Sequence, residues 1–157
     1  FFPEYYEWLD EISPAHIFSR SIHGEGFRMR KSFENGILNY RKYDSCLENA
    51  LTVESPESLC KIALNRLRWP SRLEDIFREK YENVIKKYMG TAFTLAVKDQ
   101  DFPMLQFICG HFSPDATALS TAIDLCIEKE WGEGNAFLIE AKHKAFSKKT
   151  FDFDLNF

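Results

Sequence analysis

The stretch from Thr91 to Phe112, TAFTLAVKDQDFPMLQFICGHF, decides the fold expected for this chain. Its apolar residues predict one helix over Thr91–Lys98 and a second over Phe102–Cys109 that ends at Gly110. Asp99–Asp101 provide a polar turn between the two helices. Two short helices, each with one apolar face, bury those faces only when other helices stack on them. The stretch therefore predicts a helical hairpin inside a larger stack of helices.

Further helices are predicted on both sides of this hairpin. Ser55 followed by Pro56 is a typical helix start, and Ser71 with Glu74 matches a capping box. Gly90 fits a C-terminal cap before the hairpin. We expect one all-α domain over 1–157, made of stacked helical hairpins. Its helices are predicted over 37–51, 56–68 and 71–89, then in the hairpins 91–112 and 114–146.

The two ends of the chain are aromatic. Over 3–12, Pro3 at the start and acidic residues in the first turn predict a helix, and the rest of 1–36 is irregular, with turns at 24–26 and 35–36. The tail 147–157 alternates apolar and polar residues, which predicts an extended segment. That tail could form a strap on the helices, a strand added to a partner's sheet, or a disordered end. The candidate partner-binding residues are Phe2, Tyr5, Trp8, Phe151, Phe153, Leu155 and Phe157.

Composition favours recognition over chemistry. Aromatic residues make up 15% of the chain, with fifteen Phe, and aromatic residues are enriched in cores and at interfaces. The net charge of −4 disfavours a general nucleic-acid binder, whose affinity depends on neutralising phosphates. Residues 20–42 are nevertheless basic. They leave open an anion-binding or helical RNA-binding alternative through Arg20, Arg28, Arg30 and Lys31.

The cysteines and the apolar runs bear on the compartment. Cys46, Cys60, Cys109 and Cys126 are widely spaced in apolar helical contexts, which is typical of reduced, buried thiols. No run is long enough for a membrane span, so no membrane partner is expected. We therefore expect an intracellular protein, cytoplasmic or nuclear. The chain shows no signal peptide and does not begin with Met, so we expect a fragment or a processed form.

No catalytic or cofactor pattern is present in the sequence. Cys109 and His111 are the only close pair of zinc-ligand types, whereas structural zinc sites normally use two such pairs. The His23–Gly26 stretch lacks the spacing and the Lys of a phosphate loop. Neither a nucleophile elbow nor a His-Glu-x-x-His motif occurs. We expect no enzyme activity, no metal and no cofactor.

Two resemblances suggest a scaffold. The stretch Thr91–Lys98 resembles the opening of an ankyrin repeat, although Ala92 and Thr94 replace its Pro and His. Thr117–Ile123 repeats the pattern, so about 91–146 resembles degenerate ankyrin repeats without room for their β-hairpin finger; a generic α-hairpin solenoid explains the same residues. The resemblance implies a protein-interaction or scaffold module of a larger assembly, with another protein as partner.

Ser58, Leu59, Ala63 and Leu67 form a short motif, Ser-Leu-x-x-x-Ala-x-x-x-Leu, that suggests a specific partner. It is similar to the elongin-binding box of SOCS-box proteins, in which a helix inserts a Leu into a pocket of the elongin adaptor. By this resemblance the chain would be a substrate receptor of a cullin–elongin ubiquitin ligase. The Leu-Pro-x-Pro motif that usually precedes the cullin-contacting part of a SOCS box is absent from this sequence. The residues that carry the resemblance are Ser58, Leu59, Ala63 and Leu67.

Overall fold

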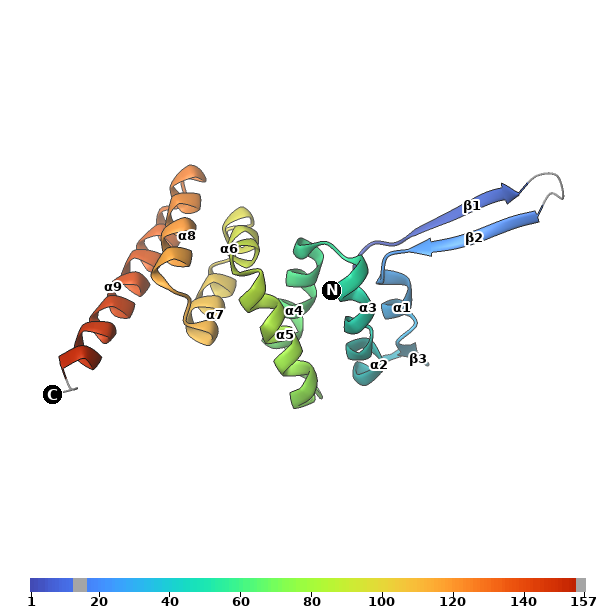
Figure 1. Ribbon diagram of the computed structural model, residues 1–157, viewed down its shortest axis with the longest axis horizontal. Helices are drawn as coiled ribbons and strands as arrows, with labels where there is room; N and C mark the ends of the chain where they lie inside the picture. Colours follow the sequence, from blue (N-terminus) through green and yellow to red (C-terminus); the bar gives the residue numbers. More distant parts are fainter. Residues whose placement is uncertain (13–16, 155–157) are drawn as a thin grey trace. The chain divides into compact units, whose positions relative to one another are not determined.

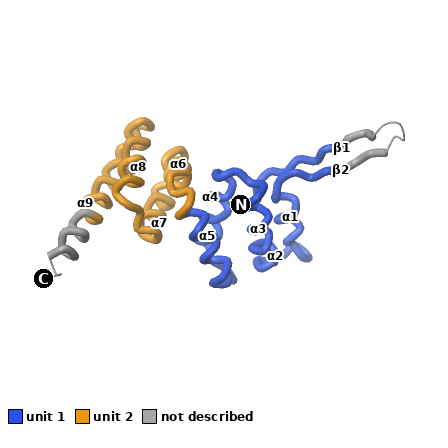
Figure 2. The backbone as a smooth tube through the Cα atoms, in the orientation of Figure 1, with its two compact units in different colours: residues 1–85 blue, residues 86–157 orange. Residues whose placement is uncertain are grey.

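The computed structural model describes the backbone of residues 1–12 and 17–154, and the side chains of residues 1–9 and 21–145. The chain divides into two compact units, 1–85 and 86–157 (Figure 2), and each is described by itself below. The expectation of a single domain stays a prediction. The all-α prediction is confirmed, because helices make up most of the described residues. In this described part, no helix is both long and apolar enough to cross a membrane.

Unit 1 begins with a β-hairpin and continues as short helices (Figure 1). The predicted helix over 3–12 is wrong: residues 6–12 form a strand, because they pair along their whole length with 17–23. The elements are β1 (Tyr6–Ile12), β2 (Ile17–His23), α1 (Gly26–Arg30), β3 (Phe33–Glu34), β4 (Ile37–Leu38), α2 (Tyr40–Ser45), α3 (Leu47–Val53), α4 (Pro56–Arg68) and α5 (Asp75–Lys87), whose last two residues belong to unit 2.

Residues 37–51 are predicted as one helix, but the structure has strand β4 followed by two short helices, α2 and α3, over this range. Asn35 and Gly36 both have positive φ, 51° and 79°, as a two-residue hairpin turn requires. They pair β3 with β4, so residues 37–38 are strand. The side chain of Asn39 then accepts from the amide of Lys42 at 3.1 Å and starts α2. The turn predicted at 35–36 is confirmed.

Helix α4 is confirmed, including its start and its end. The side chain of Ser55 accepts from the amide of Ser58 at 3.2 Å, and Pro56 occupies the first turn. The next helix begins later than predicted, at Asp75. The carbonyls of Trp69 and Ser71 accept from the Arg66 guanidinium at 3.1 and 3.2 Å. These bonds hold the 69–74 segment outside a helix, so the capping box predicted at 71–74 does not start α5.

The core of unit 1 surrounds one buried polar cluster. Arg66 donates from Nε and Nη2 to the two carboxylate oxygens of Asp44, at 2.7 and 2.9 Å. The hydroxyl of Tyr81 donates to Asp44 Oδ1 at 2.8 Å. Burial lowers the pKa of Arg66, but its hydrogen bonds to Asp44 and the charge of Asp44 outweigh this and raise it. All three side chains are at most 5% exposed, so the cluster ties α2, α4 and α5 together.

Unit 2 consists of two stacked helical hairpins, as the opening stretch predicts. Its elements are α6 (Met89–Lys98), α7 (Phe102–Phe112), α8 (Ala116–Glu128) and α9 (Gly132–Asp154). Helix α6 packs on α7 and α8, and α9 packs on α8 and α7. Asp101 caps α7 by accepting from the amide of Met104 at 2.9 Å. Gly90 lies in the first turn of α6, so its predicted role as a cap is wrong.

The predicted extended tail is also wrong over most of its length. Helix α9 continues through Asp154, and residues 155–157 lie outside the described residues. The alternation of Phe151, Asp152, Phe153 and Asp154 is compatible with more than one backbone conformation. Helix α9 starts at Gly132, and no Pro or Gly interrupts it after residue 134. The helix therefore continues through the alternating segment.

Candidate functional site

The hairpin of β1 and β2 extends away from the helices of unit 1 (Figure 1). The two strands pair antiparallel, from Tyr6 opposite His23 to Ile12 opposite Ile17, with one partner for every residue. In the described part of the chain no third strand joins this sheet. Each strand therefore has one edge that is not hydrogen-bonded to another strand.

The base of the hairpin is held by a close backbone crossing. A Cβ on Gly26 would lie 1.9 Å from the carbonyl oxygen of Pro3, and a Cβ on Gly24 would lie 2.7 Å from that of Glu4. Gly24 also has φ of +90°, which L-residues rarely adopt. Arg30 Nη1 donates to the same Pro3 carbonyl at 2.8 Å. The two glycines therefore let the N-terminal segment pass directly over the turn that follows β2.

The buried Glu25 between these glycines fixes the turn to α3. Its amide donates to Glu54 Oε1 at 2.7 Å, and its own Oε2 accepts from the Asn49 side-chain amide. The side chain of Glu25 is 1% exposed. A turn that the sequence suggests only by its glycines is thus attached to α3 and its C-cap at two points, which fixes the base of the hairpin.

Two of the predicted N-terminal partner-binding residues belong to this base. The ring of Phe2 lies 5.4 Å from the ring of Tyr43, and the ring of Tyr5 lies 5.3 Å from that of Phe27. The Arg30 guanidinium lies over both rings, 5.9 Å from Phe2 and 5.3 Å from Tyr5. Phe2 and Tyr5 are half-buried and serve as anchors in this fold.

The third predicted residue, Trp8, lies on the hairpin with its side chain 59% exposed. Three neighbours missed by sequence reasoning are also exposed: Tyr6 at 69%, Leu9 at 66% and Ile22 at 37%. Trp8 and Leu9 are successive residues of a strand and so point to opposite faces. Both faces of the ribbon therefore present apolar side chains. The strand-forming residues of IFSRSIH, at 17–23, are the sequence signal that could have identified this hairpin.

The predicted C-terminal partner-binding residues cannot be assigned to a surface. The backbone of Phe151 and Phe153 is helical within α9, but their side chains lie outside the described residues, as do Leu155 and Phe157 altogether.

The structure brings together only part of the predicted anion-binding set. Arg30 is engaged with Pro3, Phe2 and Tyr5 as described above, and Lys31 Nζ lies 4.2 Å from the ring centre of Phe27. The side chain of Arg20 is outside the described set. Arg28 is exposed and lines a hollow of about 490 Å³ with Lys31 and Lys42, and the acidic Glu25 and Glu48 line it as well. The anion-binding and RNA-binding alternatives stay predictions.

The apolar residues of the elongin-box resemblance lie in the core. Leu59 is 2% exposed, Ala63 0% and Leu67 4%, and Ser58, half-buried, donates its amide to the cap residue Ser55. A Leu that inserts into a partner's pocket must be accessible. In this fold the apolar face of α4 is already covered, so the adaptor alternative lacks its contact surface.

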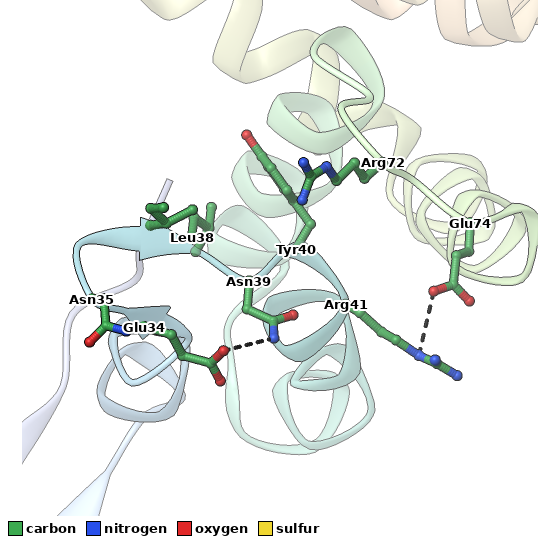
Figure 3. Close-up of a pocket in the computed structure, with 9 residues that line it drawn as sticks. Glu34, Asn35, Leu38, Asn39, Tyr40, Arg41, Arg72 and Glu74 are labelled. Carbon is green, nitrogen blue, oxygen red and sulfur yellow. Dashed lines mark hydrogen bonds and ion pairs between the residues drawn. The ribbon is translucent and has the colours of Figure 1, made fainter.

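A polar cleft of about 500 Å³ opens between the β3–β4 turn, the start of α2 and the segment before α5 (Figure 3). Arg41 Nε pairs with Glu74 Oε1 at 3.4 Å, and Asn39 Nδ2 donates to Glu34 Oε2 at 3.3 Å. Arg72 and Tyr40 also line this cleft (Figure 3). These carboxylates already have partners and are well exposed, so the cleft holds no acid–base pair tuned for catalysis.

The described titratable groups do not form a reactive centre. Burial raises the pKa of Cys60 to about 12 and that of Cys109 to about 11, and burial with the nearby Glu25 raises the pKa of Cys46 to about 11. Such thiols stay protonated at neutral pH, whereas the thiolate is the nucleophile. Among the described residues, no group of three His, Cys, Asp or Glu is arranged to hold a metal ion.

Comparisons with protein-family models, with curated proteins and with solved structures found no match to this chain. We take the hairpin β1–β2, whose base is fixed and whose described apolar residues are exposed, as the candidate site.

Proposed function

We propose that this chain is a non-enzymatic protein-interaction module that binds a partner protein through the β1–β2 hairpin. One observation carries the proposal: among the described side chains of the two-stranded ribbon, Tyr6, Trp8, Leu9 and Ile22 are exposed, and they lie on both of its faces.

The energetics of a lone hairpin support a partner. A two-stranded hairpin is marginally stable in water unless a third strand or a helix packs on it. Burying an exposed Trp or Leu side chain contributes about 1.5–3 kcal/mol, and Trp and Tyr are the residues most enriched in binding hot spots. A partner that covered Trp8 or Leu9 would therefore gain affinity and complete the ribbon.

The rigid base supports the same proposal. Because Gly24, Glu25 and Gly26 are fixed to the N-terminal segment and to α3, the root of the hairpin needs no ordering when a partner binds. Binding costs less when the contact residues are held in place beforehand.

The stacked hairpins of unit 2 fit a scaffold role within this proposal. Two stacked hairpins, α6–α7 and α8–α9, joined by only Ser113–Asp115, support this role because they are compatible with the ankyrin-like resemblance of 91–146. We infer degenerate ankyrin-like repeats that lack the β-hairpin finger of that family, so that partner contact would pass to the hairpin of unit 1.

The experiment compares two double variants of the tagged chain. Trp8→Ser/Leu9→Ser removes exposed apolar groups from the hairpin. Trp69→Ser/Ile76→Ser is the matched control, because these residues are 58% and 59% exposed elsewhere in unit 1. Affinity purification with quantitative mass spectrometry should show binding proteins that are lost from the hairpin variant and retained by the control.

Folding of both variants is checked by far-UV circular dichroism. If the two variants are folded and capture the same proteins as the unmodified chain, the hairpin is not the binding surface and the proposal is wrong.

A further inference from the structure

The two edges of the hairpin differ in charge, and this difference bears on the kind of partner. Strand β1 contains Glu7, Asp10 and Glu11 and no basic residue, whereas β2 contains Arg20 and His23 and no acidic residue. We propose that the outer edge of β1 accepts a basic, extended segment of a partner protein as a third strand. This inference rests on the proposed interaction function and specifies the chemistry of its partner.

The edge itself suits strand addition. Its seven residues pair with β2 without a bulge, and at about 3.3 Å per residue they offer an edge of about 23 Å. In an antiparallel pair, alternate residues direct their N–H and C=O groups away from the partner strand. Protected edges commonly carry charged side chains, Pro or a bulge. Strand β1 has neither Pro nor a bulge, and its acidic residues oppose pairing with an acidic strand but not with a basic one.

Charge selects which strand can join. Opposite charges on neighbouring strands are favourable, and like charges directly opposite are destabilising. A basic segment therefore suits β1, while pairing of β1 with the β1 of a second copy would bring acidic residues together. An acidic segment would instead suit the β2 edge.

The exposed side chains add a second requirement. Trp8 and Leu9 lie on opposite faces and are each more than half exposed. A joining strand would place one side chain next to each of them, so it should carry aliphatic residues on both faces. The expected ligand is an extended segment in which basic and aliphatic residues are interspersed.

The test uses the full chain and a seven-residue peptide, Thr-Lys-Lys-Val-Val-Lys-Thr, with blocked ends and a fluorescent label. Its two adjacent Val residues point to opposite faces of an extended strand. Binding is followed by fluorescence anisotropy, and the contact is located by amide NMR of the ¹⁵N-labelled chain. We expect saturable binding, with the largest shifts and new amide protection in β1 and smaller effects in β2. A peptide with Glu in place of Lys should not bind β1.

Two controls separate strand addition from general attraction between charges. The same peptide N-methylated at every residue keeps its side chains but lacks backbone donors, so it should not bind. Glu7→Lys/Asp10→Lys should weaken binding by about tenfold. Glu79→Lys/Glu128→Lys changes the net charge equally at exposed positions outside the hairpin and should weaken it much less.

Each other result overturns the inference. The inference is wrong if the N-methylated peptide binds equally well or if both charge variants weaken binding equally. It is also wrong if the NMR shifts centre outside β1 or if no binding occurs. If the peptide does not bind but Trp8→Ser/Leu9→Ser still loses partners from cells, the interaction function stands and only the basic-strand inference fails.

Discussion

Replacing Asp44 by Asn should destabilise unit 1 by about 3–5 kcal/mol, the range expected when a buried ion pair loses one partner. Asp44 is 1% exposed and accepts two hydrogen bonds from Arg66 and one from Tyr81. Asn keeps the shape but offers only one acceptor oxygen. Its amide group would face a donor of Arg66 or Tyr81, and the 5% exposed guanidinium would keep its charge without a counterion.

Variants of Tyr81 and Arg66, which contact Asp44, give the comparison for this loss of stability. Tyr81→Phe removes one hydrogen bond to a charged group and leaves the ion pair, so it should cost about 1.5–3 kcal/mol. Arg66→Met leaves a buried carboxylate and should be as harmful as Asp44→Asn. In the double variant Asp44→Asn/Arg66→Met both charges are gone, so its cost should fall below the sum of the single costs by about 2 kcal/mol.

The assay must report on unit 1, because the two units need not unfold together. Hydrogen–deuterium exchange of peptides from α2 and α4 gives the free energy of opening at that place, and urea denaturation followed at 222 nm gives a global value. If the stability losses of Asp44→Asn and Arg66→Met add up in the double variant, the two buried charges do not depend on each other and the reasoning is wrong. A smaller loss for Asp44→Asn than for Tyr81→Phe would also refute it.

Three further predictions concern other parts of the chain. Gly26→Ala should release the N-terminal segment, because its Cβ would lie 1.9 Å from the Pro3 carbonyl oxygen; exchange of amides in β1 and β2 should rise, and unchanged exchange would contradict the crossing. Gly110→Ala, with no atom within 4 Å of the added Cβ, should stabilise α7 by about 0.5–1 kcal/mol, seen as a higher melting temperature of unit 2. The folded pKa of Cys60 is raised from 9.0 to about 12, so the folded state keeps a proton that the unfolded state loses above pH 9. Stability should therefore fall as pH rises from 9 towards 12, and Cys60→Ala should make that fall shallower in pH-dependent urea titrations; an equal fall would contradict it.

Unit 2 was predictable from sequence because its signals are local and agree with one another. In Thr91–Phe112 the apolar spacing, the polar turn at 99–101 and the capping Asp101 all point to two helices. The start of α4 at Ser55-Pro56 is equally local. Where each neighbouring signal supports the same structure, a single sequence is enough to place the element.

The hairpin was missed because its deciding contacts are not local. Within 3–12, Phe2, Tyr6 and Leu9 recur at helical spacing, and Pro3 with its acidic neighbours fits a helix start. The competing strand depends on pairing with 17–23 and on the crossing at Gly24 and Gly26, neither of which the residues 3–12 encode alone. Aromatic residues are good strand formers, so the pairing outweighs a weak helical preference.

The difference between helix and strand also changes the candidate site, although Trp8 belongs both to the site predicted from the sequence and to the exposed hairpin. On the predicted helix over 3–12, Tyr5 and Trp8 would lie one turn apart at i and i+3 and would act as one contact surface. In the structure Phe2 and Tyr5 are held under Arg30, while Trp8 is joined by Tyr6, Leu9 and Ile22 on an open ribbon. A helix would offer a partner only side chains, whereas a ribbon also offers the backbone groups of its edges. The change from helix to strand therefore adds main-chain recognition to the aromatic contacts, and makes the charge difference between β1 and β2 relevant to the choice of partner.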